Sequence, residues 1–396
     1  MKSFIDKLHE RFVTTSIHNT KKEVDVGKWL TFLESLPKSN SNVEKSYNKF
    51  LCRMYYFPAW KRRVMNFCGF FADFVVAFYV LFSYKTIADK RNGVLVLERS
   101  RDVPDFSDIV PRELYKKYRE VIVVDNYNKK FGLLCKETRR FWVDAVKRYP
   151  FQFFFHYWVY MELAAHTHFL LKYNPETVAV YVNERNIVSP ILTELYETHG
   201  RKLISFMHGE YLLQLVQAHM KFSEYYVWDE SYVKMFRDIL RCDADFICYK
   251  PGKFEKRWHL EVYNPSYLCT YYFSDPTEKS IYNVAEIFKE FISKGKKCKV
   301  RMHPRSTVNT KLIKQVFSKA GVEVEDSNTV SLEKSLGETQ YAVGMETTVL
   351  FEALAEGRNI VLDDVSDVSS FKNLQDRWFR LLQVDHILLS ELIKET

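Results

Sequence analysis

A histidine and a proline interrupt one of the short apolar segments of this chain. The stretch KVRMHPRST covers residues 299–307 and leads an apolar run into His303-Pro304, with an arginine on either side. Proline has no N–H to donate, so it ends a strand ladder and leaves the imidazole at the edge of the sheet. Because Arg305 adds a fixed positive charge beside that imidazole, the stretch predicts a phosphate-binding site at a strand end.

A pair of threonines forms the second candidate, in GMETTVLFEALAEG at residues 344–357. Thr347 and Thr348 stand where a helix is expected to begin, so their hydroxyls and the free backbone N–H groups would form an anion site at the positive end of the helix dipole. Glu352 lies four residues beyond Thr348 on the same helical face, within reach of a ribose hydroxyl. Ordinary turns and helix caps give either pattern alone, but the combination in one half of the chain predicts nucleotide binding.

Candidates for a general base lie in the first half. Glu98 in VLERS, Glu184 in YVNERN, and His208 and Glu210 in MHGEY each lie at the end of an expected strand. Gly209 permits an unusual backbone angle, which would set His208 and Glu210 beside a cleft. The alternative is a capping or core histidine next to a solvated glutamate.

The elements that must position these residues follow an alternating pattern. Runs rich in Val, Ile and aromatic residues predict strands at 93–100, 120–127, 177–185, 202–210 and 224–230, and a second series at 267–276, 297–302, 322–326, 340–345 and 359–364. Longer helix-forming segments separate them, and Gly295, Gly321 and Gly357 end three of the expected helices. This alternation predicts an α/β fold with two Rossmann-like doubly wound domains.

We expect three regions along the chain. A helical, aromatic N-terminal region at 1–90 precedes a Rossmann-like domain at 91–255 and a nucleotide-binding Rossmann-like domain at 256–396, with the boundary between residues 250 and 265. At 396 residues, the chain exceeds what one ordinary core supports, which agrees with two domains.

Two long apolar segments require separate interpretation. Residues 67–84 follow Lys61-Arg62-Arg63 and precede Lys85, which is the flank pattern of a membrane-contacting segment, although Asp73 lies inside it. A buried helix, an interfacial membrane helix and a membrane span all remain open for this tract.

The second apolar segment, 151–173, directly precedes an expected strand, so a packed crossover helix is favoured. It contains His156, His166 and His168, but histidines two residues apart point to different sides of a helix and do not form a metal site.

Composition narrows the functional classes. Lys and Arg exceed Asp and Glu by 58 to 50, a net charge of +8, which favours phosphorylated substrates or an anionic membrane surface. No basic stripe with a reading motif is visible, so nucleic-acid binding is not expected. Seven scattered cysteines without a C-x-x-C pair argue against disulfides and zinc, and an amphipathic N-terminus does not indicate export, so we expect a cytoplasmic location.

Other cofactor motifs are absent or misplaced. No G-x-G-x-x-G or Walker-type sequence occurs, and no cofactor is expected. Asp243 and Asp245 form a D-x-D triplet, but they fall near the expected domain junction and not after a nucleotide-binding strand. We therefore expect no bound metal.

Taken together, MHPRS and METTVLFEAL, about forty residues apart, resemble motifs of bacterial GT-B glycosyltransferases that use CMP-activated sugars. That group includes the sialyltransferases and polysialyltransferases of capsules and lipooligosaccharides and the Kdo transferases of capsule assembly. The wider group includes teichoic acid glycerophosphate polymerases, which use CDP-glycerol and often show a His-Gly in the first half, as MHGEY does here. The resemblance covers roughly residues 200–365. Two features depart from it: the pair is Thr-Thr where many members have Ser-Ser, and no acidic motif of the first half is matched.

The resemblance implies roles for individual residues. His303 would contact the donor phosphate and help CMP depart, Thr347 and Thr348 would hold that phosphate, and Glu352 would meet the ribose or base. An inverting, metal-independent transfer also needs a base at the acceptor hydroxyl, for which His208, Glu210 and Glu184 are the candidates.

We thus expect a glycosyltransferase that moves sialic acid or Kdo from a CMP-sugar to a bacterial surface glycan, in the capsule or lipopolysaccharide. The acceptor would be a glycan or a lipid-linked glycan, and the enzyme would work in the cytoplasm or at the inner face of the cell membrane. The alternatives are a CDP-glycerol glycerophosphotransferase, a UDP- or GDP-sugar transferase, and a non-catalytic sugar- or nucleotide-binding subunit of capsule assembly.

Overall fold

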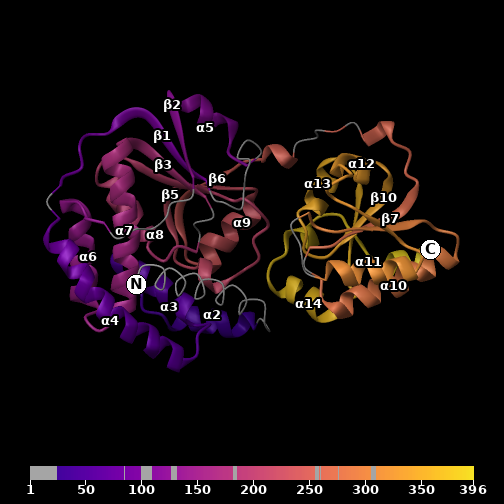
Figure 1. Cartoon of the computed structure of the whole chain (residues 1–396), viewed down its shortest axis with the longest axis horizontal. Coiled ribbons are helices and arrows are strands. Elements are labelled where there is room, and N and C mark those ends of the chain that lie inside the picture. Colours follow the sequence, from indigo (N-terminus) through magenta and orange to yellow (C-terminus); the bar gives the residue numbers. More distant parts are fainter. Residues whose placement is uncertain are drawn as a thin grey trace. The chain divides into compact units, whose positions relative to one another are not determined.

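The computed structural model describes residues 25–396 except 84, 100–108, 126–131, 182–184, 255–257, 259, 275 and 305–308. The described residues form two compact units (Figure 1). One unit comprises the chain up to His208 together with Leu213–Lys250, and the other comprises Gly209–Leu212 together with Pro251–Thr396.

A six-stranded parallel sheet forms the centre of the first unit. Its strands run in the order β2-β1-β3-β4-β5-β6. Their bounds are Arg91–Arg99 (β1), Glu120–Asp125 (β2), Pro175–Tyr181 (β3), Lys202–Phe206 (β4), Lys221–Val227 (β5) and Asp243–Cys248 (β6). The chain reverses its direction of winding between β1 and β3, so the carboxyl ends of these two strands flank the crevice where such sheets bind ligands.

Helices cover this sheet and include an N-terminal helical region, as expected. Their bounds are Val26–Ser35 (α2), Asn42–Met54 (α3), Ala59–Leu81 (α4), Arg112–Lys117 (α5), Lys136–Arg148 (α6), Phe153–Tyr173 (α7), Ser189–Glu197 (α8) and Glu230–Lys234 (α9). Short 3-10 or π turns follow at Leu215–Gln217 (η1) and Met235–Ile239 (η2). Asp25 and Ser41 cap α2 and α3 through their side chains, as these residue types favour.

Helix α7 is the crossover helix predicted for the aromatic segment before β3. Nearly all of its residues between Phe155 and Leu170 are buried, on every side of the helix. A helix that is apolar all round must be covered all round. Here α4 and α6 pack against it, and its last turn leads directly into β3.

The second unit also contains a six-stranded parallel sheet, in the order β12-β11-β10-β7-β8-β9. Its strands are Tyr267–Tyr272 (β7), Cys298–Arg301 (β8), Glu323–Glu325 (β9), Thr339–Gly344 (β10), Asn359–Leu362 (β11) and Ile387–Leu388 (β12). Numbered within this unit, the order is 3-2-1-4-5-6, the Rossmann arrangement, and its topological switch point lies between β7 and β10.

The helices of this unit alternate with its strands. Their bounds are Glu278–Ser293 (α10), Thr310–Lys319 (α11), Leu332–Gly337 (α12), Val349–Ala355 (α13), Val368–Asp376 (α14) and Leu389–Glu395 (α15), with 3-10 turns at Gly252–Phe254 (η3), Leu260–Val262 (η4) and Arg380–Gln383 (η5). Gly295, Gly321 and Gly357 have φ values of +77°, +73° and +76°. These left-handed conformations end α10, α11 and α13, as the glycines predict.

The fold class predicted from the pattern of strands and helices is confirmed. Each unit contains a doubly wound α/β sheet, and an N-terminal helical region precedes the first strand in the sequence. Two strands were not predicted. β6 contains the D-x-D triplet and forms one edge of its sheet, and β12 is only two residues long. Both are edge strands with mixed exposure, so neither shows the continuous apolar run of a buried parallel strand.

Candidate functional site

The candidate phosphate-binding residues of the second unit lie at one edge of its sheet. Val343 of β10 and Val300 of β8 both pair with Tyr271 of β7, so the three strands are in register across the switch point. His303 therefore follows Val300 by as many residues as Glu346 follows Val343, and Thr347 is the residue after Glu346. Two strand spacings, about 10 Å, separate the β8 and β10 ends.

His303 is exposed and follows β8, as the strand-ending proline predicts. Pro304 begins a turn directly after it. Arg305, the second proposed contact for the phosphate, lies outside the described residues.

Thr347 and Thr348 are half-buried and lie between β10 and α13, beside the switch point. Their placement depends on Gly344, the last residue of β10. A Cβ atom at position 344 would lie 3.0 Å from Thr347 Cγ2 and 3.2 Å from the carbonyl oxygen of Tyr272. The absence of a side chain at Gly344 thus lets Thr347 fold back over the end of the strand. The sequence analysis did not predict this role for Gly344.

The prediction of free N–H groups at the start of this helix is wrong in detail. Val349 N donates to Thr347 Oγ1 at 3.4 Å, Leu350 N donates to Thr347 O at 3.3 Å, and Phe351 N donates to Thr348 O at 3.1 Å. The chain forms a tight turn before α13, and the N–H groups of Val349, Leu350 and Phe351 are hydrogen-bonded within this turn. An anion at this edge would therefore meet the two threonine hydroxyls and not the N–H groups of Val349, Leu350 and Phe351.

Glu352 lies one turn into α13 and is half-buried. Its backbone N–H donates to Thr348 O at 3.2 Å, which places it one helical turn beyond Thr348 as predicted. Its neighbour on the next turn, Glu356, is buried and accepts from the Trp258 backbone N–H at 3.3 Å. Glu356 therefore has a structural role and Glu352 remains the carboxylate nearest the threonine pair along this helix.

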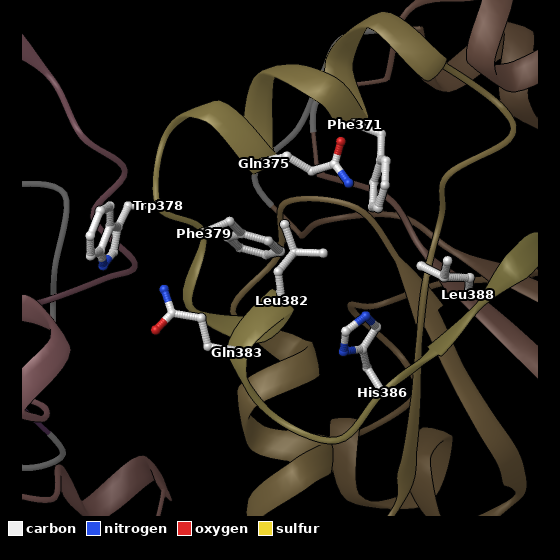
Figure 2. Close-up of a pocket in the computed structure, with 8 residues that line it drawn as sticks. All are labelled: Phe371, Gln375, Trp378, Phe379, Leu382, Gln383, His386 and Leu388. Carbon is white, nitrogen blue, oxygen red and sulfur yellow. The ribbon is translucent and has the colours of Figure 1, made fainter. Parts of the chain in front are cut away.

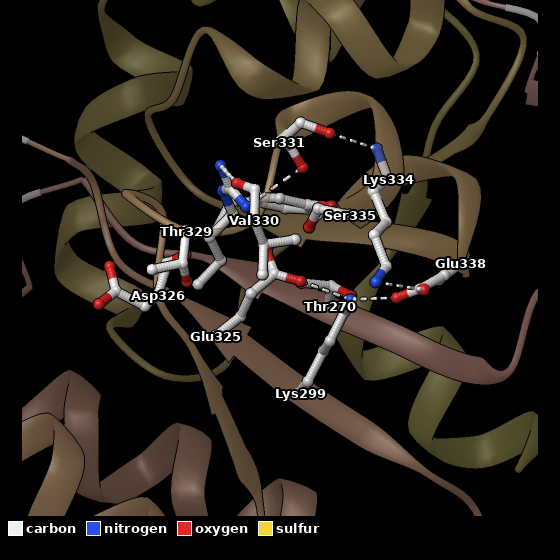
Figure 3. A network of polar contacts seen from close by, with 12 residues as sticks. Thr270, Lys299, Glu325, Asp326, Thr329, Val330, Ser331, Lys334, Ser335 and Glu338 are labelled. Carbon is white, nitrogen blue, oxygen red and sulfur yellow. Dashed lines mark hydrogen bonds and ion pairs between the residues drawn. The ribbon is translucent and has the colours of Figure 1, made fainter.

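Arg301, the arginine before His303, does not belong to the phosphate site. It is buried and its guanidinium pairs with Glu325 of β9, while Nη2 donates to Val330 O at 2.9 Å. Lys299 Nζ joins the same carboxylate at 2.5 Å and Glu338 at 3.2 Å (Figure 3). This network fixes β8 against β9 and so positions the loop that carries His303.

The cations of this network lower the pKa of Glu325. Burial by itself raises the pKa of Glu325, but the hydrogen bonds from Lys299 and Arg301 outweigh it and hold the pKa below its usual value. Lys299 and Arg301 alternate along β8, and Glu323 and Glu325 alternate along β9, a charge pattern from which this pairing could have been predicted.

Asp363 closes the same edge after β11. It is fully buried, accepts from Tyr271 Oη at 2.6 Å and from Ser366 N at 2.8 Å, and its own N–H donates to Gly344 O at 3.0 Å. Burial, together with the Asp363 charge, raises the pKa of Tyr271 well above its usual value. Asp363 was not among the predicted residues; its contacts show that it ties the end of β10 to β11.

In the first unit, His208 follows β4 by two residues and is half-buried. The prediction that Gly209 has an unusual backbone angle is wrong: its φ lies outside the left-handed region, and a Cβ there would have no neighbour within 4 Å. Glu98 lies near the end of β1, half-buried, on the strand next to β3. Glu184 lies outside the described residues.

Glu210 belongs to the short segment Gly209–Leu212 that is grouped with the second unit. One carboxylate oxygen accepts from the backbone N–H of Arg380 at 3.1 Å. Glu210 therefore has a backbone partner in the second unit.

No group of three or more metal-ligating side chains occurs among the described residues. Asp243 of the D-x-D triplet lies within β6 and pairs with Lys45 at 3.0 Å. His156 contacts Asp73 of α4 at 2.7 Å, and His166 Nδ1 contacts Tyr196 Oη of α8 at 3.0 Å. Both histidines thus have partners within the chain.

An open hollow of about 490 Å³ lies elsewhere on the second unit (Figure 2). Its lining is largely apolar and aromatic and comes from α14, η5, β12 and the segments between them: Phe371, Gln375, Trp378, Phe379, Leu382, Gln383, His386 and Leu388. His303, Thr347 and Thr348 do not line this hollow. The hollow and the candidate phosphate site therefore share no residue.

No protein-family model matches the sequence, and no curated protein matches it either. Solved structures do resemble the chain. It is similar to a variant of the wall teichoic acid polymerase TagF with CDPG, at 11% identity and a TM-score of 0.43, over 85% of this chain and 88% of that one. A glycosyltransferase from Rickettsia africae ESF-5 is 9% identical with a TM-score of 0.39, over 72% and 80% of the two chains. The glycosyltransferase of kitacinnamycin is 12% identical with a TM-score of 0.39, over 72% and 85%.

Proposed function

We propose that this protein is a glycosyltransferase that transfers a sugar, sialic acid or Kdo, from a CMP-sugar to a bacterial capsule or lipopolysaccharide glycan. One observation carries the proposal: the 3-2-1-4-5-6 sheet of the second unit, with Thr347 and Thr348 at its switch point and His303 after the strand next to β7. Parallel sheets of this order bind nucleotides at that crevice. The order of the His-Pro and Thr-Thr motifs supports a cytidine nucleotide donor.

The donor-side roles follow from the chemistry of the side chains. The hydroxyls of Thr347 and Thr348 donate to the donor phosphate, and Glu352, on the same helix, accepts from a ribose hydroxyl. His303, in its protonated form, donates to the phosphate oxygen that becomes the leaving group. As the bond between the anomeric carbon and that oxygen breaks, CMP carries away the electron pair and the imidazolium balances its charge.

The acceptor-side roles are assigned to the first unit. His208 at the end of β4 is the base that we propose for the acceptor hydroxyl, and Glu184 is the second choice. The base takes the hydroxyl proton while the acceptor oxygen forms its bond to the anomeric carbon, with inversion. This scheme needs no metal, because the histidine and the hydroxyls stabilise the departing phosphate.

The test is nucleotide release from purified protein with CMP-sialic acid, CMP-Kdo, CDP-glycerol, and UDP- and GDP-sugars, each with acceptor extracts. CMP release from one CMP-sugar, lowered about a hundredfold or more by His303→Ala, supports the proposal. His386→Ala is the matched control, since it removes an imidazole from the same unit at the separate hollow.

The other outcomes are equally informative. Release from CDP-glycerol or from a UDP- or GDP-sugar alone would replace the proposed donor. No release and no binding of any nucleotide would contradict an enzymatic role and favour a non-catalytic subunit. Equal losses in His303→Ala and His386→Ala would remove the assignment of His303.

A further inference from the structure

Helix α4 carries an apolar face that no described part of the chain covers. Large side chains at spacings of three and four residues form this face, which we call the α4 outer face: Trp60, Val64, Phe67, Phe71, Phe74, Phe78 and Leu81. All of them are exposed, and Phe74 is 84% exposed. Such a contiguous apolar surface on a folded unit marks an interaction site.

The opposite face of α4 is firmly packed. Met65, Gly69, Val76 and Val80 are buried on the side facing α7. A Cβ at position 69 would lie 2.5 Å from Phe154 N, so the two helices touch at the backbone. Packing against α7 thus explains why the inner face of α4 is apolar. It does not explain the apolar outer face.

Polar contacts lock the same interface. Asn66 Nδ2 donates to Phe151 O at 2.8 Å, and Asn66 Oδ1 accepts from Phe154 N at 3.1 Å. Further along, Asp73 Oδ2 contacts His156 Nδ1 at 2.7 Å. These bonds hold α4 lengthwise on α7, which itself leads into β3 in the interior of the sheet.

This packing distinguishes between the ways in which α4 could meet a membrane. Among the described residues, α4 is the one helix long and apolar enough to span a bilayer. Spanning would require it to leave α7, exposing the buried surface of α7 and breaking the contacts of Asn66 and Asp73. A helix that stays on α7 can instead lie in the plane of the interface with its outer face in the lipid.

The charges beside the outer face indicate the kind of lipid. Arg62 and Arg63 are exposed in the first turn next to Trp60, and Lys85 is exposed beyond the end of the helix. The only acid in the sequence of α4 is Asp73, which points toward His156 on the inner side. Cations flanking an apolar, aromatic surface complement anionic headgroups, whereas a second copy would offer these arginines no acid on this face.

We propose that the α4 outer face docks the first unit onto an anionic phospholipid membrane, with α4 lying parallel to the surface. Phe151 extends the apolar surface beyond α4: it is 75% exposed, and its carbonyl is bonded to Asn66. In Figure 1, α4 lies along the outer edge of its unit. The inference does not depend on the proposed donor.

The test is flotation of the full chain with vesicles of phosphatidylcholine alone or mixed with phosphatidylglycerol. We expect binding to the mixed vesicles, and at least about a tenfold loss of bound fraction in the double variant Phe67→Asp/Phe74→Asp. Val262→Asp/Val368→Asp is the matched control, because it adds two aspartates at exposed valines of the second unit. Arg62→Gln/Arg63→Gln should lower binding to the mixed vesicles and weaken its salt dependence.

Several results would overturn the inference. Wild-type protein that stays unbound with both kinds of vesicle would by itself contradict membrane docking. Equal binding by Phe67→Asp/Phe74→Asp and its control would place the membrane contact elsewhere. A dimer in light scattering that Phe67→Asp/Phe74→Asp dissociates would assign the face to a second copy, and protein that resists carbonate extraction would indicate a span. Circular dichroism of each variant checks that the fold is retained.

Discussion

Thr347 lies against Gly344 so closely that a Cβ at position 344 would be 3.0 Å from Thr347 Cγ2. The same Cβ would meet the carbonyl oxygen of Tyr272 at 3.2 Å, and that backbone atom belongs to the neighbouring strand. The end of β10 is therefore shaped by the lack of a side chain, and the position of the threonine pair depends on it.

The first prediction concerns this contact. Gly344→Ala should raise the KM for the donor about tenfold or more, because Thr347 must move away from the strand end while the sheet remains intact. Initial-rate kinetics over a range of donor concentrations measure the change. Gly27→Ala in α2 is the control, since its Cβ meets only Asp25 Oδ1 at an ordinary 3.4 Å. An unchanged KM in Gly344→Ala would show that the donor does not use Thr347.

The second prediction concerns the buried charge network. Glu325→Gln removes the carboxylate between Lys299 and Arg301 and leaves two buried cations poorly paired, at a cost of about 3–5 kcal/mol. Hydrogen exchange of the β8 and β9 amides reports this loss. Glu323→Gln on the same strand is the control and should change stability by less than about 1 kcal/mol, because Glu323 is exposed.

The network also has a pH dependence. Because the folded-state pKa of Glu325 is lowered, its stabilising contribution is present above its usual pKa and is lost as the pH falls through the folded value. Glu325→Gln should therefore lose less stability on acidification than wild type does. Identical acid profiles of the two proteins would contradict this account.

A third prediction concerns His219 in the first unit. Burial, with smaller effects from the charges of Lys49, Arg241 and Lys45, lowers the pKa of His219 to about 3. The unfolded chain binds this proton near pH 6.5 and the folded chain does not, so stability should fall as the pH drops from about 6.5 toward 3. Urea unfolding followed by tryptophan fluorescence at several pH values measures the slope.

The matched variants separate His219 from other histidines. His219→Gln should flatten the dependence in this range, and His199→Gln, at a half-buried position after α8, is the control for the loss of a histidine from the same unit. The same slope in His219→Gln and wild type would assign the titration to another group.

The fourth prediction concerns the contact between α4 and α7. Gly69→Ala places a methyl group 2.5 Å from Phe154 N, and since the obstacle is backbone, the helices must separate at a cost of about 1–3 kcal/mol. Thermal unfolding measures the loss. Cys68→Ala is the control at the adjacent, exposed position and should leave the midpoint almost unchanged. A neutral Gly69→Ala would mean that α4 is not held against α7 as described.

Local pattern was enough to predict much of this molecule. Most strands of both units, and the helices between them, could be predicted because buried parallel strands are short apolar runs and because Gly295, Gly321 and Gly357 end helices through their own backbone freedom. For the same reason, the positions of His303 and of Thr347-Thr348 at strand ends followed from residue order alone. The edge strands β6 and β12 lack such runs and were missed.

Tertiary structure decided the features that depend on residues distant in the sequence. The order β9-β8-β7-β10 arises from non-local pairing, and it alone puts His303 and Thr347 at one edge. Pairing with β9 also turned Arg301 inward to Glu325, although its sequence neighbour His303 is exposed. Likewise, α4 has apolar side chains on both faces, and only packing against α7 determined which face is buried and which remains open.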